Sequence, residues 1–112
     1  MTLNRSTALL CILLTLPGIA LSQKFADRAY VTNFDTDYIS VIDLKSMEKI
    51  ADVRTGKNPH GAAISPDGNY VAVSNEENDS VSIINPTTNA VVRIIPVGRS
   101  PKRLAVEKVN TQ

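Results

Sequence analysis

The chain has 112 residues, with 12 basic and 11 acidic side chains and a formal net charge of +1 at pH 7. This even balance lacks the basic footprint of a nucleic-acid-binding protein. The single cysteine excludes an intrachain disulfide framework, and it excludes a zinc or iron–sulfur site held by several cysteines.

The N-terminus has the layout of a secretory signal peptide. Arg5 provides the positive end, residues 8–16 form a short apolar run, and small residues precede a cleavage site after Ser22. The run is shorter than the ~20 residues of a membrane-spanning helix, so no stable membrane span is expected. We predict a signal peptide over 1–22, a mature domain over 23–112 and a periplasmic or secreted location.

An internal repeat with a period of 42 residues organises the rest of the chain. Shifting the sequence by 42 positions without a gap aligns YVTNFDTDYISVID, residues 30–43, with AVSNEENDSVSIIN, residues 72–85. Gly56 aligns with Gly98, and a proline follows three positions later in both copies. Because glycine and proline mark turns of defined geometry, we expect one structural unit to be repeated.

Each unit is predicted to contain four short strands. In the complete copy they are 61–65, 70–75, 80–85 and 90–97, and the first two are joined by a tight turn, SPDG, at 65–68. Apolar residues occur on both faces of these strands, as expected of a sheet packed between two others, and no segment has helical periodicity. Four strands in about 40 residues are typical of one β-propeller blade.

The units on either side of this blade are partial. A partial blade at 29–57 lacks its innermost strand, the full blade covers 61–98, and the innermost strand of a third blade is predicted at 102–107. The predicted fold class is therefore all-β, with four-stranded antiparallel blades that form an incomplete ring of about two blades. A ring needs about four to eight blades to cover every face. We expect other blades as partners, from the rest of a longer protein, from a partner chain or from self-association.

The repeat resembles the YVTN family of β-propeller repeats. The resemblance is carried by YVTN at 30–33, ISVID at 39–43 and NPHGAAISPDGNYVAVSN at 58–75, and it extends over 29–107. The family occurs in bacterial and archaeal surface and periplasmic proteins, which agrees with the predicted export. The resemblance implies a binding or scaffold module. It leaves open a fragment or subunit of a larger propeller oxidoreductase, linked to a quinone or haem, or of a lactonase-like hydrolase.

The candidate binding surface lies in the loops that surround the channel end of a propeller. These loops are expected at 34–38, 57–61, 76–80 and 99–103, where a small ligand or a protein would bind. The candidate residues are one histidine, five acidic residues and three basic residues: His60, Asp35, Asp37, Glu76, Glu77, Asp79, Arg99, Lys102 and Arg103.

Two cofactors are compatible with these residue types. The imidazole of His60 could ligate haem or a metal ion, and the carboxylates could supply oxygen ligands to Ca²⁺. Each group also has a structural interpretation, as a loop histidine, as turn-stabilising aspartates or as solvated cations, so no cofactor or metal is predicted. The sequence contains no G-x-S-x-G, no phosphate-binding glycine loop and no CxxCH, and the module is predicted to be non-catalytic.

Overall fold

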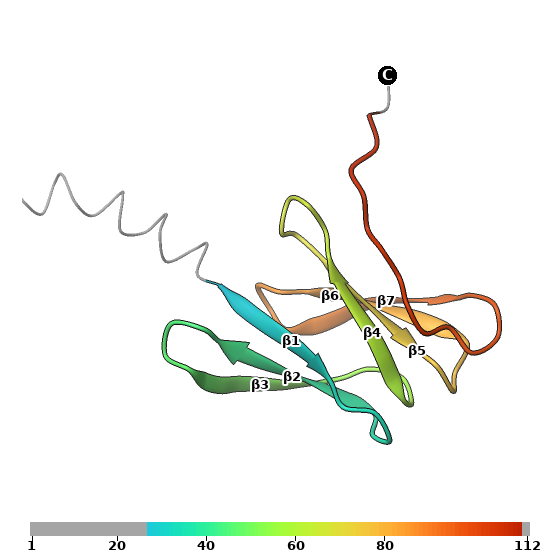
Figure 1. The fold of residues 1–112 in the computed structure, drawn as a ribbon, viewed down its shortest axis with the longest axis horizontal. Helices are drawn as coiled ribbons and strands as arrows, with labels where there is room; N and C mark the ends of the chain where they lie inside the picture. The colour runs from blue at the N-terminus through green and yellow to red at the C-terminus, as the bar shows by residue number, and fades with distance from the viewer. Residues whose placement is uncertain (1–26, 111–112) are drawn as a thin grey trace, which may run out of the picture.

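A computed structural model describes residues 27–110 of the chain, so the predicted signal peptide lies outside the described residues. The described residues form seven strands in two antiparallel sheets and no helix (Figure 1). This confirms the all-β prediction. No helix in the described part of the chain is long and apolar enough to cross a membrane. The first sheet has the order β1 (Arg28–Thr32), β2 (Tyr38–Asp43), β3 (Glu48–Arg54), and the second has the order β4 (Pro59–Ile64), β5 (Val71–Asn75), β6 (Ser80–Asn85), β7 (Ala90–Pro96).

The 42-residue period recurs in the backbone geometry. A β-bulge directly after Val41 in the first sheet recurs directly after Ile83 in the second. The turns that follow are also equivalent, because Met47 and Asn89 both have positive φ, at 61° and 56°. In each turn the amide of this residue donates to the carbonyl four positions earlier, at 2.8 Å. The two sheets are therefore two copies of one unit.

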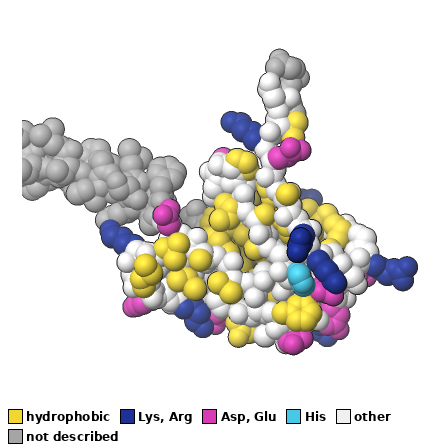
Figure 2. All heavy atoms as spheres, viewed as in Figure 1, with side chains coloured by type: hydrophobic (Ala, Val, Ile, Leu, Met, Phe, Trp, Pro, Cys, Tyr) yellow, Lys and Arg dark blue, Asp and Glu magenta, His cyan; other side chains and the backbone are white. Residues whose placement is uncertain are grey.

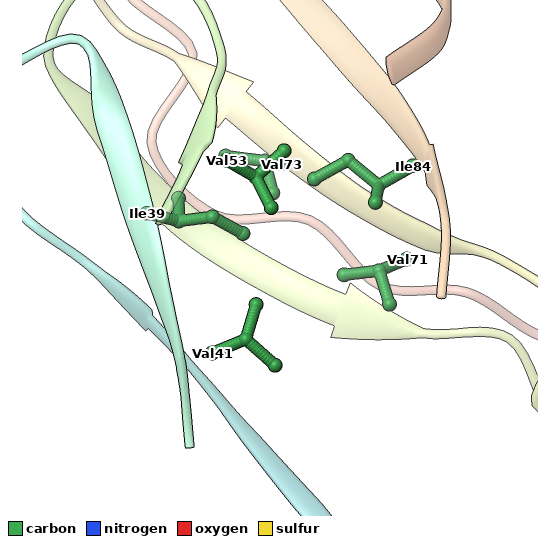
Figure 3. Packing of buried hydrophobic residues seen from close by; sticks show 6 residues of the cluster. All are labelled: Ile39, Val41, Val53, Val71, Val73 and Ile84. Atoms are coloured by element: carbon green, nitrogen blue, oxygen red, sulfur yellow. The ribbon is translucent and has the colours of Figure 1, made fainter. Parts of the chain in front are cut away.

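The hydrophobic core lies where the two sheets pack face to face. Strands β2 and β3 of the first sheet provide one side, and strands β5 and β6 of the second provide the other (Figure 3). β-Branched residues dominate both sides, as is typical of strands packed against a second sheet. The buried cluster consists of Ile39, Val41, Val53, Val71, Val73 and Ile84.

The structure differs from the prediction after β7. Residues 102–107, predicted to be the innermost strand of a third blade, form no strand, and Figure 1 shows the chain here as a coil that leaves the second sheet. A strand requires a hydrogen-bonded neighbour, and none of the strands within 27–110 pairs with these residues. The start of the segment is nevertheless held in place, because the Ser74 hydroxyl donates to the Lys102 carbonyl at 2.7 Å.

Candidate functional site

Four loops meet at one end of the two sheets, which we call the loop face. They are residues 33–37 between β1 and β2, 55–58 between β3 and β4, 76–79 between β5 and β6, and 97–103 after β7. Backbone hydrogen bonds join each loop to the next. The loop that connects the sheets is bonded on one side to the first sheet and on the other to the second: Asn58 N to Thr36 O at 2.8 Å, and Glu76 N to Asn58 O at 3.0 Å.

An asparagine beneath the loops fixes the connection between the sheets. Asn75 is fully buried, and its Oδ1 accepts from the Gly56 amide at 3.0 Å. Its Nδ2 donates to the hydroxyls of Ser80 and Ser82, at 3.1 and 2.9 Å. The buried amide thereby has partners for both its donor and its acceptor atoms, as buried polar groups require. A Cβ on Gly56 would lie 2.7 Å from Asn75 Cγ, so only glycine permits this approach.

The imidazole of His60 lies exposed at the start of β4. The ring of Phe34, from the first sheet, packs against it edge to face, with centroids 5.7 Å apart and an interplanar angle of 86°. The Thr32 hydroxyl donates to the His60 carbonyl at 3.1 Å. Figure 2 shows the histidine beside basic and hydrophobic side chains, with acidic groups nearby. The imidazole is thus oriented by a neighbouring blade and remains open to solvent.

Two of the five candidate carboxylates make specific contacts. The Asp37 carboxylate forms an ion pair with Arg54, and Asp79 Oδ1 accepts from the Ser100 amide at 2.9 Å. Asp35 and Glu77 are exposed and Glu76 is half-buried. Within residues 27–110, no three His, Cys, Asp or Glu side chains come together as a metal site. The structure therefore places these acids around the loop face without bringing them together at one point.

The three candidate basic residues extend from the last loop of the loop face. Arg99, Lys102 and Arg103 are exposed, and they form none of the ion pairs found in the described part of the chain. Their backbone is held against β4 and β5, since a Cβ on Gly61 would collide with the Lys102 carbonyl. The backbone of this segment is thus held against the second sheet, while the charged side chains remain exposed to solvent.

Sequence reasoning missed Phe34. The Phe34 side chain is 48% exposed. In the sequence it lies in an acidic loop, where no pattern distinguishes it from its neighbours. The only signal is an aromatic residue directly after YVTN, in a loop expected at the channel end. Its partner, His60, lies 26 positions away in the other sheet, and only the packing of the sheets shows that the two rings meet.

Comparison with known proteins gives a match over almost the whole chain. Residues 6–109 match the family model described as the cytochrome D1 heme domain. A PE-PGRS family protein of Mycobacterium tuberculosis, PE_PGRS18, is 42% identical over 52 residues, which are 46% of this chain and 11% of that protein. The chain therefore spans about a tenth of that relative.

Solved structures share the fold at low sequence identity. Hydrazine synthase of Kuenenia stuttgartiensis superposes with a TM-score of 0.68 and 24% identity, over 70% of this chain and 22% of that one. The dihydro-heme d1 dehydrogenase NirN, in complex with DHE, gives 0.58 and 25%, over 68% and 16%. The β-propeller domain of Myceliophteria thermophila Cps50 gives 0.54 and 14%, over 71% and 29%. The two sheets therefore have the fold of β-propeller blades, and the chain spans about a quarter or less of the first two structures.

Proposed function

The chain belongs to the cytochrome D1 heme domain family, and from this premise we propose that it contributes two neighbouring blades to a β-propeller and acts as a non-catalytic binding module. The loop face is the binding surface. One observation carries this proposal: backbone hydrogen bonds fix the four loops to one another, while most of the charged side chains on them remain exposed. Loops held on a rigid scaffold are the usual place for binding residues.

The proposal includes the family type and the location. The repeats are of the YVTN type, which the YVTN and ISVID segments on the first two strands support. The leader at 1–22 and cleavage after Ser22 direct the module to the periplasm or the exterior. The remaining blades of the ring are its structural partners, because the open faces of a partial ring are apolar.

Haem is the ligand that family membership favours, and the loop face exposes one histidine and three basic side chains of the types that bind it. His60 presents an imidazole that can ligate iron. Arg99, Lys102 and Arg103 present cations that can pair with the two propionates. Other blades of the ring would supply the remaining walls of a haem pocket. Bound haem supplies redox chemistry, and the alternative function is then a part of a haem-linked oxidoreductase.

Titration with haemin tests haem binding at the loop face directly. We expect one-site binding of haemin to the full chain, with a shift of the Soret band that reports imidazole ligation. His60→Ala should weaken binding at least tenfold, which corresponds to about 1.4 kcal/mol. Thr87→Ala, an exposed position at the opposite end of the second sheet, should bind as the unaltered chain does. An unchanged Soret band, or equal binding by the His60→Ala variant, would rule out ligation of haem by His60 in this chain.

A further inference from the structure

The outer faces of the two sheets repeat the two sides of the interface between them. Val73 on β5 is fully buried against the first sheet, whereas its repeat equivalent on β1, Val31, is 41% exposed. Val53 on β3 is 3% exposed, whereas its equivalent on β7, Ile95, is 41% exposed. The outer face of the first sheet therefore has the side chains that the second sheet uses in the interface, and the outer face of the second sheet has those of the first.

The main polar contact of the interface also recurs among the described residues as two unpaired halves, with a donor at one outer face and an acceptor at the other. Inside the chain, the amide of Gly56 donates to Asn75 Oδ1 at 3.0 Å. The equivalent glycine, Gly98, has open space, with no described atom within 4 Å of an added Cβ. The equivalent asparagine, Asn33, is oriented as Asn75 is, because Nδ2 of each donates to the serine seven positions later at 2.9 Å. Donor and acceptor of a second such bond thus lie at opposite ends of the described chain.

The start of the segment after β7 is held where a third blade would begin. The bond from the Ser74 hydroxyl to the Lys102 carbonyl, 2.7 Å long, is equivalent to the bond from Thr32 to the His60 carbonyl, 3.1 Å long. His60 lies in β4, the innermost strand of its blade, which pairs with β5. By the same register, residues 103–107 would pair with a strand of the β1 type, with Ala105 opposite the equivalent of Ala72.

The charges of the two ends are complementary. Residues 27–54, which contain the first sheet, have six acidic and four basic side chains. Residues 90–110, which contain β7 and the segment after it, have five basic side chains and one acidic side chain. Opposite net charges accelerate association and favour one orientation of the partners. A head-to-tail arrangement brings these opposite charges together.

We propose that the chain associates head to tail with copies of itself. The first sheet of one copy packs on the outer face of the second sheet of the next, and its β1 pairs with residues 103–107 of that next copy. Asn33 then accepts from Gly98 as Asn75 accepts from Gly56. Each interface completes a four-stranded blade. A heterologous contact of this kind forms a closed ring when the rotation fits, and three or four copies give about six or eight blades. The inference does not depend on a ligand at the loop face.

Sedimentation velocity of the full chain over a range of concentrations tests this inference. We expect species at multiples of the monomer mass, with dissociation on dilution. Gly98→Val should weaken association at least tenfold, because the added side chain fills the space for the asparagine of the neighbouring copy. Ala105→Pro should do the same, because proline removes an amide and disfavours strand pairing. Thr87→Val, at the opposite end of the second sheet, is the matched control and should leave association unchanged.

Both variants are expected to keep the fold of the single chain. No described atom lies near the Cβ position of residue 98, and residue 105 is in no strand, so far-ultraviolet circular dichroism should be unchanged. A chain that stays monomeric at about 100 μM, a concentration at which contacts of micromolar affinity are occupied, would overturn the proposal. Association that neither variant weakens would overturn it as well. In either case the neighbouring blades would come from the rest of a longer protein or from another polypeptide.

Discussion

At the scale of single residues, the repeated glycine shows which features of a turn can be predicted from the sequence and which cannot. Its recurrence at 56 and 98 predicts a turn that needs glycine, and a turn does lie there. The structure gives another reason at Gly56, which is not among the residues with positive φ. Glycine is required because Asn75 from the other sheet approaches its backbone. Such an approach depends on how two sheets pack, and no spacing within one repeat encodes it.

Gly56→Ala is expected to destabilise the fold by roughly 1–3 kcal/mol, the usual cost of overpacking a close contact. The added methyl group would lie 2.6 Å from Asn78 Oδ1, so the loop would have to shift away from the second sheet. Gly98→Ala is the matched control and should stay within about 0.5 kcal/mol in the monomer, as open surface positions do. Urea unfolding at low protein concentration measures both. Equal stability of the two variants would contradict the role given to Asn75.

Asp67 in the SPDG turn should titrate at a lower pH than an ordinary aspartate. The Asn69 amide donates to its carboxylate at 2.9 Å and the Ser65 hydroxyl at 2.7 Å, and these bonds lower the pKa of Asp67. A lowered pKa in the folded state stabilises the turn at a pH above the ordinary value of about 3.9, and this stabilisation is lost as the pH falls through the lowered value.

Carbon-detected NMR of the Asp67 carboxyl group measures this pKa. Ser65→Ala should raise the pKa, without reaching the ordinary value, because the Asn69 amide remains. A midpoint for Asp67 at or above the ordinary aspartate value would show that these hydrogen bonds do not persist in solution.

At the scale of elements, the strands with apolar residues on both faces were predictable. The runs at 70–75, 80–85 and 90–97 appear as β5, β6 and β7 with ends shifted by one residue at most, because each is rich in β-branched residues and pairs with a neighbouring strand of the same blade. Residues 103–107, RLAVE, repeat the apolar centre of a strand with one β-branched residue and form no strand. Their pairing depends on a neighbouring strand that the described residues do not provide, so local pattern alone could not determine their conformation.

The positions of the loop-face residues were also predictable only in part. Their common end was predictable, because strand order and hairpin turns decide which loops lie together. Their contacts were not, since the pairs Phe34–His60 and Asp79–Ser100 each join segments more than 20 positions apart. Side chains of different strands or blades meet at a distance that only the packing of sheets determines.

The two equivalent valines on the sheets should respond differently to truncation. Val73→Ala removes two buried methyl groups from the core and should cost on the order of 2 kcal/mol. Val31→Ala, at the equivalent position on the outer face, should cost less than half as much in the monomer, because that side chain is 41% exposed. Chemical denaturation of both variants at low concentration gives the difference. Equal losses would mean that the outer face of the first sheet is also buried in the monomer.

At the scale of the whole molecule, the fold depends on the packing of one blade against the next. Each sheet alone would leave an apolar face in water, and the buried cluster between the sheets is what one blade cannot form by itself. The recurring bulges, turns and hydrogen bonds show that the second sheet has the same geometry as the first. From that equivalence follow the loop face, the open outer faces and the proposed contact between copies.

Methyl NMR of the folded chain tests this packing most directly. With isoleucine and valine methyl groups labelled, nuclear Overhauser effects should connect Ile39, Val41 and Val53 of the first sheet with Val71, Val73 and Ile84 of the second, which form one buried cluster. They should persist at a dilution where the chain is monomeric. Effects confined within each sheet, with none between the two groups of methyls, would contradict the face-to-face packing of the two sheets.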